Sequence, residues 1–272
     1  MTSWEFPASG PVDARISLPS GSVRVTASHA TTATISLVPA RSAGGSRAAE
    51  QLIGETEVSF EGGRLTVAVP KHVHIRGSAA LDLAIELPAG SSVDSHTASA
   101  DLEVSGELGT LTVDSASGDV TADTISGPAN ITTASGDVRL QEVTGDARVK
   151  TASGDTVIGR ADGELTMNSA SGDLKVSQAK QRVQAKTASG DIEIDSIAEG
   201  RADVTTVSGD IRIAVPPGTG VYLDLSSLTG SVRSDLAESG RGDTEGETGL
   251  ALSCNSVSGD IRVTRANAGV TR

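Results

Sequence analysis

The chain has 272 residues, of which 35 are acidic and 22 are Lys or Arg, giving a formal net charge of −13 at pH 7. This excess of negative charge argues against a protein that binds nucleic acid or anionic membranes, because both ligands attract Lys and Arg. Aromatic residues make up only 1% of the chain. Its core must therefore be built from small aliphatic side chains, because large rings are scarce.

Three features of the sequence predict the compartment. The start, MTSWEFPASGPVDARISLP, has neither the basic nor the apolar segment of a secretory signal. No apolar run reaches the ~20 residues that a membrane-spanning helix requires. The single cysteine, Cys254, cannot form an internal disulfide and fits a reducing compartment. We therefore expect a soluble cytoplasmic protein without membrane insertion.

Residues 1–96 have the composition of β-strands but no exact repeat. GSVRVTA at 21–27 and GRLTVAV at 63–69 each predict a corner followed by a short strand, and SRAAEQLIG at 46–54 predicts a helix. The first strand of a repeated array exposes an unpaired edge, which favours a covering segment. We therefore interpret 1–96 as a β-rich cap region that is continuous with the repeats.

From Ser99 onward the chain repeats every nine residues. Units such as SGDVTADTI at 117–125, SGDVRLQEV at 135–143 and SGDIEIDSI at 189–197 have glycine at position two and apolar residues at positions four, six and nine. Positions four and six share one face of a strand, because side chains alternate across the pleat. Glycine at position two permits a tight corner. Each unit therefore predicts one short strand and one corner.

Units that begin with Ser-Gly-Asp alternate with looser units such as TGDARVKTA at 144–152. Two alternating kinds of strand predict a coil of about 18 residues in which like strands stack on like. The two sheets would lie about 10 Å apart, and successive coils would rise about 4.8 Å. The predicted fold is all-β: a two-sided β-solenoid (a β-helix, expected to be right-handed) over 97–272, with a cap that carries one short helix.

The Ser-Gly-Asp corners are expected to stack along one edge of the solenoid. Asp and Ser side chains at turns accept hydrogen bonds from nearby backbone N–H groups, which favours a structural role. Stacked carboxylates could also bind cations, but the repeat lacks the additional glycines of calcium-binding nonapeptides. We therefore predict no metal and no cofactor. The predicted structural corner ladder consists of Gly118, Asp119, Gly136, Asp137, Gly154, Asp155, Gly172, Asp173, Gly190, Asp191, Gly209 and Asp210.

The repeat becomes irregular after Val215. PPGTG at 216–220 precedes VYLDLSSLTGSVRSDL at 221–236, which contains a relaxed corner at Thr229-Gly230-Ser231. We interpret the polar stretch AESGRGDTEGETG at 237–249 as a loop insertion. The pattern returns in VSGDIRVTRA at 257–266, and we expect this distant segment to form the last coil.

The sequence contains no catalytic signature. A G-x-S-x-G elbow, a P-loop and a dinucleotide fingerprint are all missing, so we expect no enzyme. His72 and His74 would share one strand face, as two metal ligands do, but no third ligand lies close in sequence and an ordinary exposed pair is favoured. Arg241–Asp243 matches the integrin-binding tripeptide Arg-Gly-Asp, which we attribute to chance in a polar loop.

The outward positions of the looser units have local positive charge. Arg148, Lys150 and Lys186 point outward there, whereas the Ser-Gly-Asp units carry acidic outward residues such as Glu193 and Asp195. Most outward positions are expected to be solvated strand faces that keep a long sheet soluble. If one face binds a protein, we expect Arg148, Lys150 and Lys186 to dock an acidic partner, including the Asp-lined edge of another copy.

Several motifs resemble a bacterial putative-adhesin, β-strand-repeat family of unknown function. They are SWEFP at 3–7, IELPAGSSV at 85–93, the serial TASGDV-like units, VSGDIRIAVPPGTG at 207–220 and VSGDIRVTRA. The resemblance covers essentially the whole chain and implies a β-helical fold; some members carry membrane anchors and some are linked to envelope-stress regulation. We predict a non-enzymatic β-solenoid scaffold or protein-interaction protein. The alternatives are a surface adhesin exported by an unrecognised route and a cation-dependent binding module.

Overall fold

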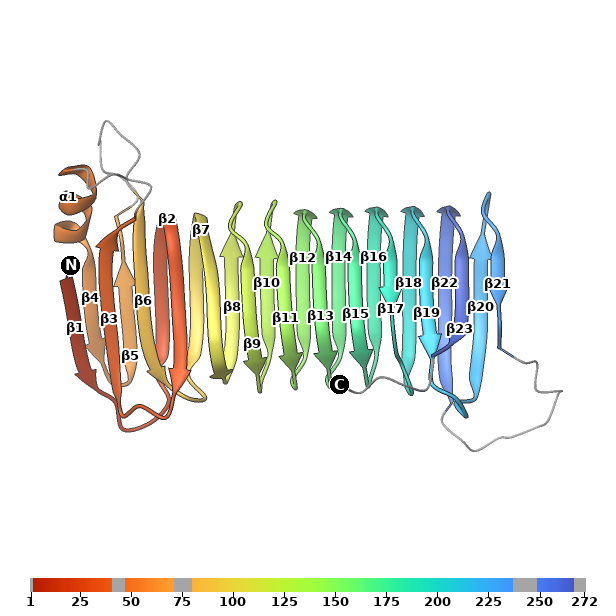
Figure 1. The fold of residues 1–272 in the computed structure, drawn as a ribbon, viewed down its shortest axis with the longest axis horizontal. Helices are drawn as coiled ribbons and strands as arrows, with labels where there is room; N and C mark the ends of the chain where they lie inside the picture. The colour runs from red at the N-terminus through yellow and green to blue at the C-terminus, as the bar shows by residue number, and fades with distance from the viewer. Residues whose placement is uncertain (1, 41–46, 71–79, 237–248, 267–272) are drawn as a thin grey trace. The chain divides into compact units, whose positions relative to one another are not determined.

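The computed structural model describes residues 2–40, 47–70, 80–236 and 249–266. The chain divides into two compact units, Met1–Val143 (unit 1) and Thr144–Arg272 (unit 2). In the described residues the secondary structure is all-β apart from one short helix, as the sequence predicts (Figure 1). No helix within those ranges is long and apolar enough to cross a membrane.

The described elements of unit 1 are β1 (Thr2–Pro7), β2 (Asp13–Ser28), β3 (Thr32–Pro39), α1 (Arg47–Glu55), β4 (Glu57–Glu61), β5 (Arg64–Ala68), β6 (Leu81–Pro88), β7 (Ser92–Leu108), β8 (Thr110–Ser115), β9 (Val120–Ile125), β10 (Ala129–Thr133) and β11 (Val138–Val143). Those of unit 2 are β12 (Ala147–Ser153), β13 (Thr156–Ala161), β14 (Leu165–Ser171), β15 (Leu174–Ala179), β16 (Val183–Ser189), β17 (Ile192–Ile194), β18 (Arg201–Ser208), β19 (Ile211–Val215), β20 (Val221–Ser227), β21 (Val232–Ser234), β22 (Leu250–Ser258) and β23 (Ile261–Arg265).

Strands of the regular region pair in parallel with the next strand but one. In unit 1, β8 pairs with β10 and β9 pairs with β11. In unit 2, β12, β14, β16 and β18 form one series, and β13, β15, β17 and β19 form the other. Leu174 lies opposite Thr156, 18 residues earlier in the chain. The two series correspond to the two kinds of nine-residue unit, so like strands stack on like in a solenoid-like parallel β fold.

The first strands of unit 1 depart from this parallel pattern. β3 is antiparallel to both β1 and β6, and β4 is antiparallel to β5. Phe6 and Phe60 stack there with ring centroids 5.3 Å apart. Helix α1, predicted at 46–54, buries Ala49 and Leu52. β2 then joins this region to β7 by parallel pairing, and β7 runs without a break through residue 96.

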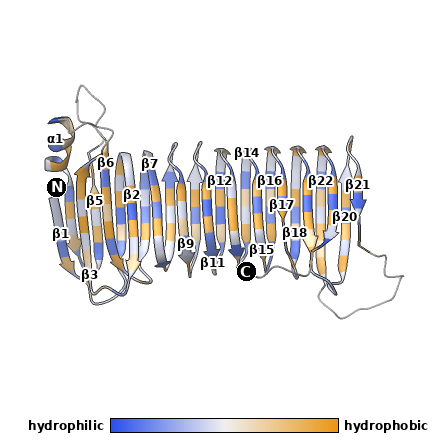
Figure 2. Ribbon diagram, in the orientation of Figure 1, coloured by the Kyte–Doolittle hydropathy of each residue, from blue (hydrophilic) through white to orange (hydrophobic). Residues whose placement is uncertain are grey.

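Hydrophobic and hydrophilic residues alternate along the strands (Figure 2), and the aliphatic ones are buried. Val138, Leu140, Ile192 and Ile194 are each at most 2% exposed, whereas Arg139 points outward. The buried core consists mostly of Ala, Val, Leu and Ile, as the scarcity of aromatic residues predicts. The period of two and its register are therefore confirmed.

Glycine is required at the corners because successive coils approach one another closely. A Cβ atom at Gly190 would overlap the carbonyl oxygen of Gly172, and its φ of +149° is one that L-residues rarely adopt. A hydroxyl three residues earlier also supports the corner, since Ser115 Oγ accepts a hydrogen bond from the Gly118 N–H at 3.0 Å. These contacts explain why glycine recurs at position two of the repeat.

The order of the last coils differs from the expected one. β22 pairs with β18 on one edge and β20 on the other, and β23 lies between β19 and β21. The returning segment is therefore the penultimate coil, and the prediction that it forms the last coil is wrong. The reason is burial: Leu250 and Leu252 of the inserted coil are at most 1% exposed, whereas Tyr222 and Leu228 of the outermost coil are exposed.

Candidate functional site

The basic residues predicted as a partner surface lie on the outward side of unit 2. Arg148 and Lys150 are on β12, Lys186 is on β16, and all three side chains are exposed. β14 lies between these strands and places Asn168 opposite both lysines. The two lysines therefore stand in one row, about 9.6 Å apart, because adjacent strands are separated by about 4.8 Å. We call Arg148, Lys150 and Lys186 the basic face.

None of the three cations of the basic face forms an ion pair with another residue that the structure describes. Nearby cations of unit 2 are paired, since Arg160 and Lys180 contact Asp162 and two further arginines contact Asp203. The difference is one of position, because the basic face has Thr, Asn and Gln as its strand neighbours. Its positive charge is thus uncompensated within a chain of net charge −13.

Asp162 is the centre of an ion cluster in unit 2 that joins Arg160 and Lys180. The Arg160 guanidinium donates two hydrogen bonds to its carboxylate, at 2.8 and 3.0 Å, and Lys180 Nζ donates a third at 2.8 Å. These hydrogen bonds, from Arg160 first and Lys180 second, lower the pKa of Asp162 to about 2. A carboxylate held ionised in this way is a structural clamp between coils and a poor general acid at neutral pH.

The Ser-Gly-Asp corners form a hydrogen-bonded ladder within each unit. In unit 1, Asp101 Oδ1 accepts a hydrogen bond from the Asp119 N–H at 3.0 Å, and Asp119 Oδ1 accepts one from the Asp137 N–H at 2.9 Å. One oxygen of each of these carboxylates therefore already accepts a hydrogen bond from the backbone of the next coil. The same contact recurs in unit 2 along Asp155, Asp173, Asp191, Asp210, Asp260 and Ser231, with distances of 2.8 to 2.9 Å.

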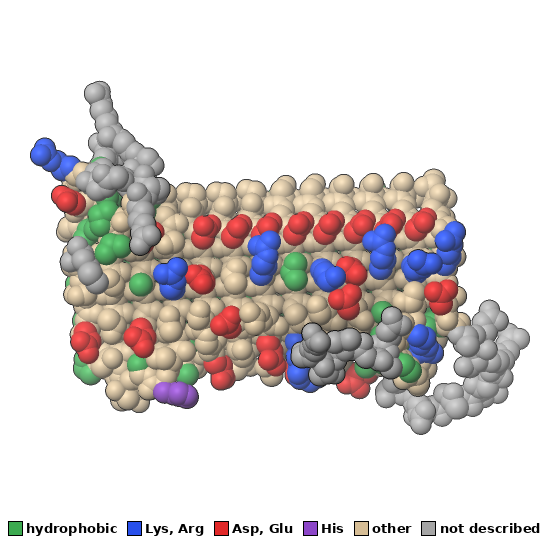
Figure 3. All heavy atoms as spheres, in the orientation of Figure 1, with side chains coloured by type: hydrophobic (Ala, Val, Ile, Leu, Met, Phe, Trp, Pro, Cys, Tyr) green, Lys and Arg blue, Asp and Glu red, His purple; other side chains and the backbone are tan. Residues whose placement is uncertain are grey.

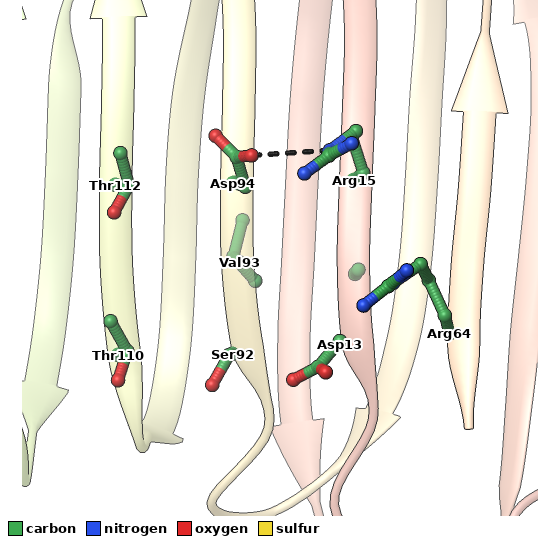
Figure 4. Close-up of a pocket in the computed structure, with 9 residues that line it drawn as sticks. Asp13, Arg15, Arg64, Ser92, Val93, Asp94, Thr110 and Thr112 are labelled. Atoms are coloured by element: carbon green, nitrogen blue, oxygen red, sulfur yellow. Dashed lines mark hydrogen bonds and ion pairs between the residues drawn. The ribbon is translucent and has the colours of Figure 1, made fainter. Parts of the chain in front are cut away.

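A depression of about 230 Å³ lies on the outward side of unit 1, over β2, β5, β7 and β8 (Figure 4). Arg15 Nε contacts Asp94 Oδ2 at 3.3 Å on its floor. Next to it, the His96 ring lies between Asp94 and Asp114, with one nitrogen 3.3 Å from each carboxylate. The depression is lined by two arginines, Arg15 and Arg64, and by two aspartates, Asp13 and Asp94, so it offers little net charge to a ligand. The sequence does not predict this site.

Other predicted features lie outside the described residues or have no site around them. His72, His74 and Arg241–Asp243 are not among the described residues, nor is most of the predicted loop at 237–249. Within the described part of the chain, no group of three or more His, Cys, Asp or Glu side chains is arranged to hold a metal ion.

Comparison with known protein families identifies the family to which the chain belongs. The family model described as Toastrack DUF4097 matches residues 14–215 and, in a second overlapping match, residues 183–264. The chain belongs to the Toastrack DUF4097 family. This membership confirms that the chain belongs to a family of unknown function, as the resemblance of its motifs implies.

Three solved structures align with nearly all of this Toastrack chain. A putative adhesin from Bacteroides fragilis is 14% identical, with a TM-score of 0.46, over 97% of this chain and 96% of its own. A putative lipid binding protein from Parabacteroides distasonis is 13% identical, with a TM-score of 0.47, over 96% of each chain. A putative adhesin from Parabacteroides merdae is 12% identical, with a TM-score of 0.43, over 96% of this chain and 95% of its own. No curated protein matches the chain.

A row of arginines on the last coils of this Toastrack chain is not predicted by the sequence. Arg212, Arg262 and Arg233 lie in register on β19, β23 and β21. All three occupy position five of a corner-plus-strand unit, which is the signal that could have identified them. Their adjacency depends on the insertion of β23 between β19 and β21, which the local pattern does not predict.

Proposed function

We propose that this Toastrack chain is a non-enzymatic β-solenoid scaffold that binds a protein partner through the basic face. The observation that carries the proposal is the exposure of Arg148, Lys150 and Lys186 without an ion pair to any described residue. Surface cations in the rest of unit 2 are often paired with Asp or Glu across coils. Unpaired cations on a flat strand face favour a partner that supplies the missing carboxylates.

The partner that this face fits is acidic. Lys150 and Lys186 stand in one row with Asn168 between them, so a carboxylate can reach a lysine ammonium and an amide together. The Asp-lined edge of a second copy has the same spacing between coils, about 4.8 Å, and is one such partner. Self-association therefore belongs to the proposal.

The remaining parts of the proposal concern the setting of this interaction. We propose that the protein works in the cytoplasm, where its single buried thiol, Cys254, suits a reducing compartment. The scaffold role requires no cofactor, nucleic acid or membrane insertion, and right-handed coils of about 18 residues belong to the same proposal. Regulation of envelope stress is the first process in which to look for the partner.

A charge-reversal experiment tests the basic face. The triple variant Arg148→Glu, Lys150→Glu, Lys186→Glu would be purified beside the wild type and used to capture partners from the native host, with sedimentation measuring self-association. We expect the variant to lose one captured protein, or its self-association, while its melting temperature stays unchanged. The fold should tolerate the change because all three side chains point into solvent.

The matched control is the triple variant Arg24→Glu, Arg47→Glu, Arg64→Glu, which changes the net charge equally but lies in unit 1. It should keep the wild-type capture profile. Identical profiles for the wild type and both variants would exclude the basic face as a binding surface. Loss in both variants would indicate that net charge, and not this face, determines the interaction.

A further inference from the structure

The corners of unit 2 change character in the last three coils. The residue two positions before the corner glycine is alanine in the earlier coils, at Ala152, Ala170 and Ala188. In the last three coils, stacked in the order β18, β22 and β20, the same position is Val207, Val257 and Leu228. These three side chains are 51%, 45% and 78% exposed. The larger apolar side chains at these three adjacent corners form an exposed apolar ridge. Exposed apolar patches of this kind often mark a site of protein–protein contact.

A row of arginines follows the same corners on the next strands. Arg212, Arg262 and Arg233 are exposed and in register across β19, β23 and β21, about 4.8 Å apart from strand to strand. Arg212 is paired with Asp191 at 3.2 Å and with Asp210 at 2.7 Å. Arg262 and Arg233 form no ion pair with any residue in the described ranges. Two guanidinium groups are thus available for an external anion.

The outermost coil lacks the carboxylate that would neutralise its arginine. Ser231 occupies the corner position that is Asp210 and Asp260 in the two coils below it. Its N–H donates to Asp260 Oδ1 at 2.8 Å, so it continues the ladder without adding a charge. A hollow of about 80 Å³ lies here between Asp260, Ser231, Arg233 and Arg262 (Figure 3 shows basic side chains gathered at this end of unit 2).

We propose that this surface, the terminal patch, docks an acidic segment of a partner protein in which carboxylate side chains alternate with aliphatic ones. The terminal patch consists of Val207, Val257, Leu228, Arg212, Arg262 and Arg233. The carboxylates pair with the free guanidinium groups, whose planar forks match a carboxylate in two hydrogen bonds. The aliphatic side chains pack on the ridge formed by the three corner residues.

The chemistry of the terminal patch favours an acidic, aliphatic protein segment over inorganic phosphate and nucleic acid. Inorganic phosphate would satisfy the arginines but leave the aliphatic ridge exposed. Nucleic acid would meet Asp210 and Asp260 beside the arginines, together with a net charge of −13. Arginine is enriched at the centre of protein interfaces, and the buried centre of an interface is more apolar than its rim. The terminal patch shares no residue with the basic face. Its arginines lie on the other series of strands, although Val207 and Val257 are on β18 and β22, which continue the series of the basic face.

Fluorescence anisotropy with the full chain tests the proposal. The probe is a short labelled peptide in which Glu and Leu alternate; its two comparison peptides alternate Glu with Ser and Lys with Leu. We expect the Glu-Leu peptide to bind at low salt, more tightly than the Glu-Ser peptide, and the Lys-Leu peptide not to bind. The double variant Arg233→Gln, Arg262→Gln should weaken binding by about tenfold, and added salt should weaken it further.

Two sets of variants complete the test. The triple variant Val207→Ala, Leu228→Ala, Val257→Ala restores the residue of the earlier corners, so it should fold normally and bind the Glu-Leu peptide no better than the Glu-Ser peptide. Arg47→Gln with Arg64→Gln, a charge-matched control in unit 1, should bind as the wild type does. Equal affinity of wild type and Arg233→Gln, Arg262→Gln would overturn the proposal. Loss of peptide binding only in the variant Arg148→Gln, Lys150→Gln would also overturn it, because the peptide would then bind the basic face. The proposal would fail as well if the wild type bound no peptide and Arg233 and Arg262 instead controlled its self-association.

Discussion

Asp173 Oδ1 accepts a hydrogen bond from the backbone N–H of Asp191 at 2.8 Å, which ties each Ser-Gly-Asp corner to the next. Replacing Asp173 by Ala leaves this N–H without its acceptor, and we expect a loss of about 1 kcal/mol in the free energy of unfolding. Asp173→Asn keeps an oxygen at the same place and should lose less. Urea denaturation measures both. Equal losses for the two variants would show that the acceptor oxygen is not what matters.

The same contact bears on the question of cations. Because the backbone already occupies Oδ1 of the ladder carboxylates, we expect calcium or a chelator to leave the melting temperature nearly unchanged. A specific site would add RT ln(1 + [L]/Kd), about 2.7 kcal/mol at a hundredfold excess over Kd. Thermal unfolding in calcium, in magnesium and in a chelator checks this. A rise of several degrees with calcium alone would support the cation-dependent alternative.

The sequence predicts the regular coils well because each coil repeats the same physical constraint. Glycine at most corners and apolar residues at positions four and six are sufficient to place Val138, Leu140, Ile192 and Ile194 inside. The repeat does not determine the order of the last coils. VSGDIR occurs at both 207–212 and 257–262, and parallel strands with the same pattern can pair with several neighbours. Burial of the better-patterned coil decides the order, and that is a tertiary effect.

The candidate sites also differ in how far the repeat predicts them. Lys150 and Lys186 belong to one row because they occupy the same position in units two coils apart, so the repeat alone predicts their alignment. Arg262 and Arg233 become neighbours only after the chain has passed through residues 234–261 and returned. The repeat predicts which way each side chain points. It does not predict which coil lies beside which.

Thr156 lies in the core row where the next coils have Leu174 and Ile192. Its side chain is fully buried, and its Oγ1 has no hydrogen-bond partner among the described residues. Thr156→Val replaces a buried, unpaired hydroxyl by a methyl group of similar shape, and we expect a gain of about 1 kcal/mol in the free energy of unfolding. Chemical denaturation measures it. A loss of stability would mean that a buried water or other partner satisfies the hydroxyl.

A destabilising substitution at Ile194 tests which face of the strand is buried. It is 1% exposed, and Ile194→Asp would bury a charge without a partner, at a cost of several kcal/mol. We expect this variant to unfold or aggregate, as followed by circular dichroism and size-exclusion chromatography. Thr205→Asp, at an outward position of β18, introduces the same side chain and should behave as the wild type. A stable Ile194→Asp protein would contradict the assigned face.

The Asp162 cluster predicts a stability that depends on pH. The hydrogen bonds from Arg160 and Lys180 lower the pKa of Asp162 to about 2 from an unfolded value near 4, so they stabilise the fold in its ionised form. This contribution is complete above about pH 4 and is lost as the pH falls toward about 2. Because both cations are about 40% exposed, solvent screens their attraction to the carboxylate, and we expect Asp162→Asn to lose about 1 kcal/mol at pH 7.

Urea denaturation of wild type and Asp162→Asn at a series of pH values checks both the size and the direction of this effect. The two proteins should differ at pH 7 and converge as the pH falls through the range of about 4 to 2. Asp235→Asn, at an exposed position, removes one carboxylate outside the cluster and should track the wild type throughout. A difference between Asp162→Asn and wild type that persists unchanged at about pH 2 would show that the asparagine disturbs packing, and that the ion cluster is not the source of the stability.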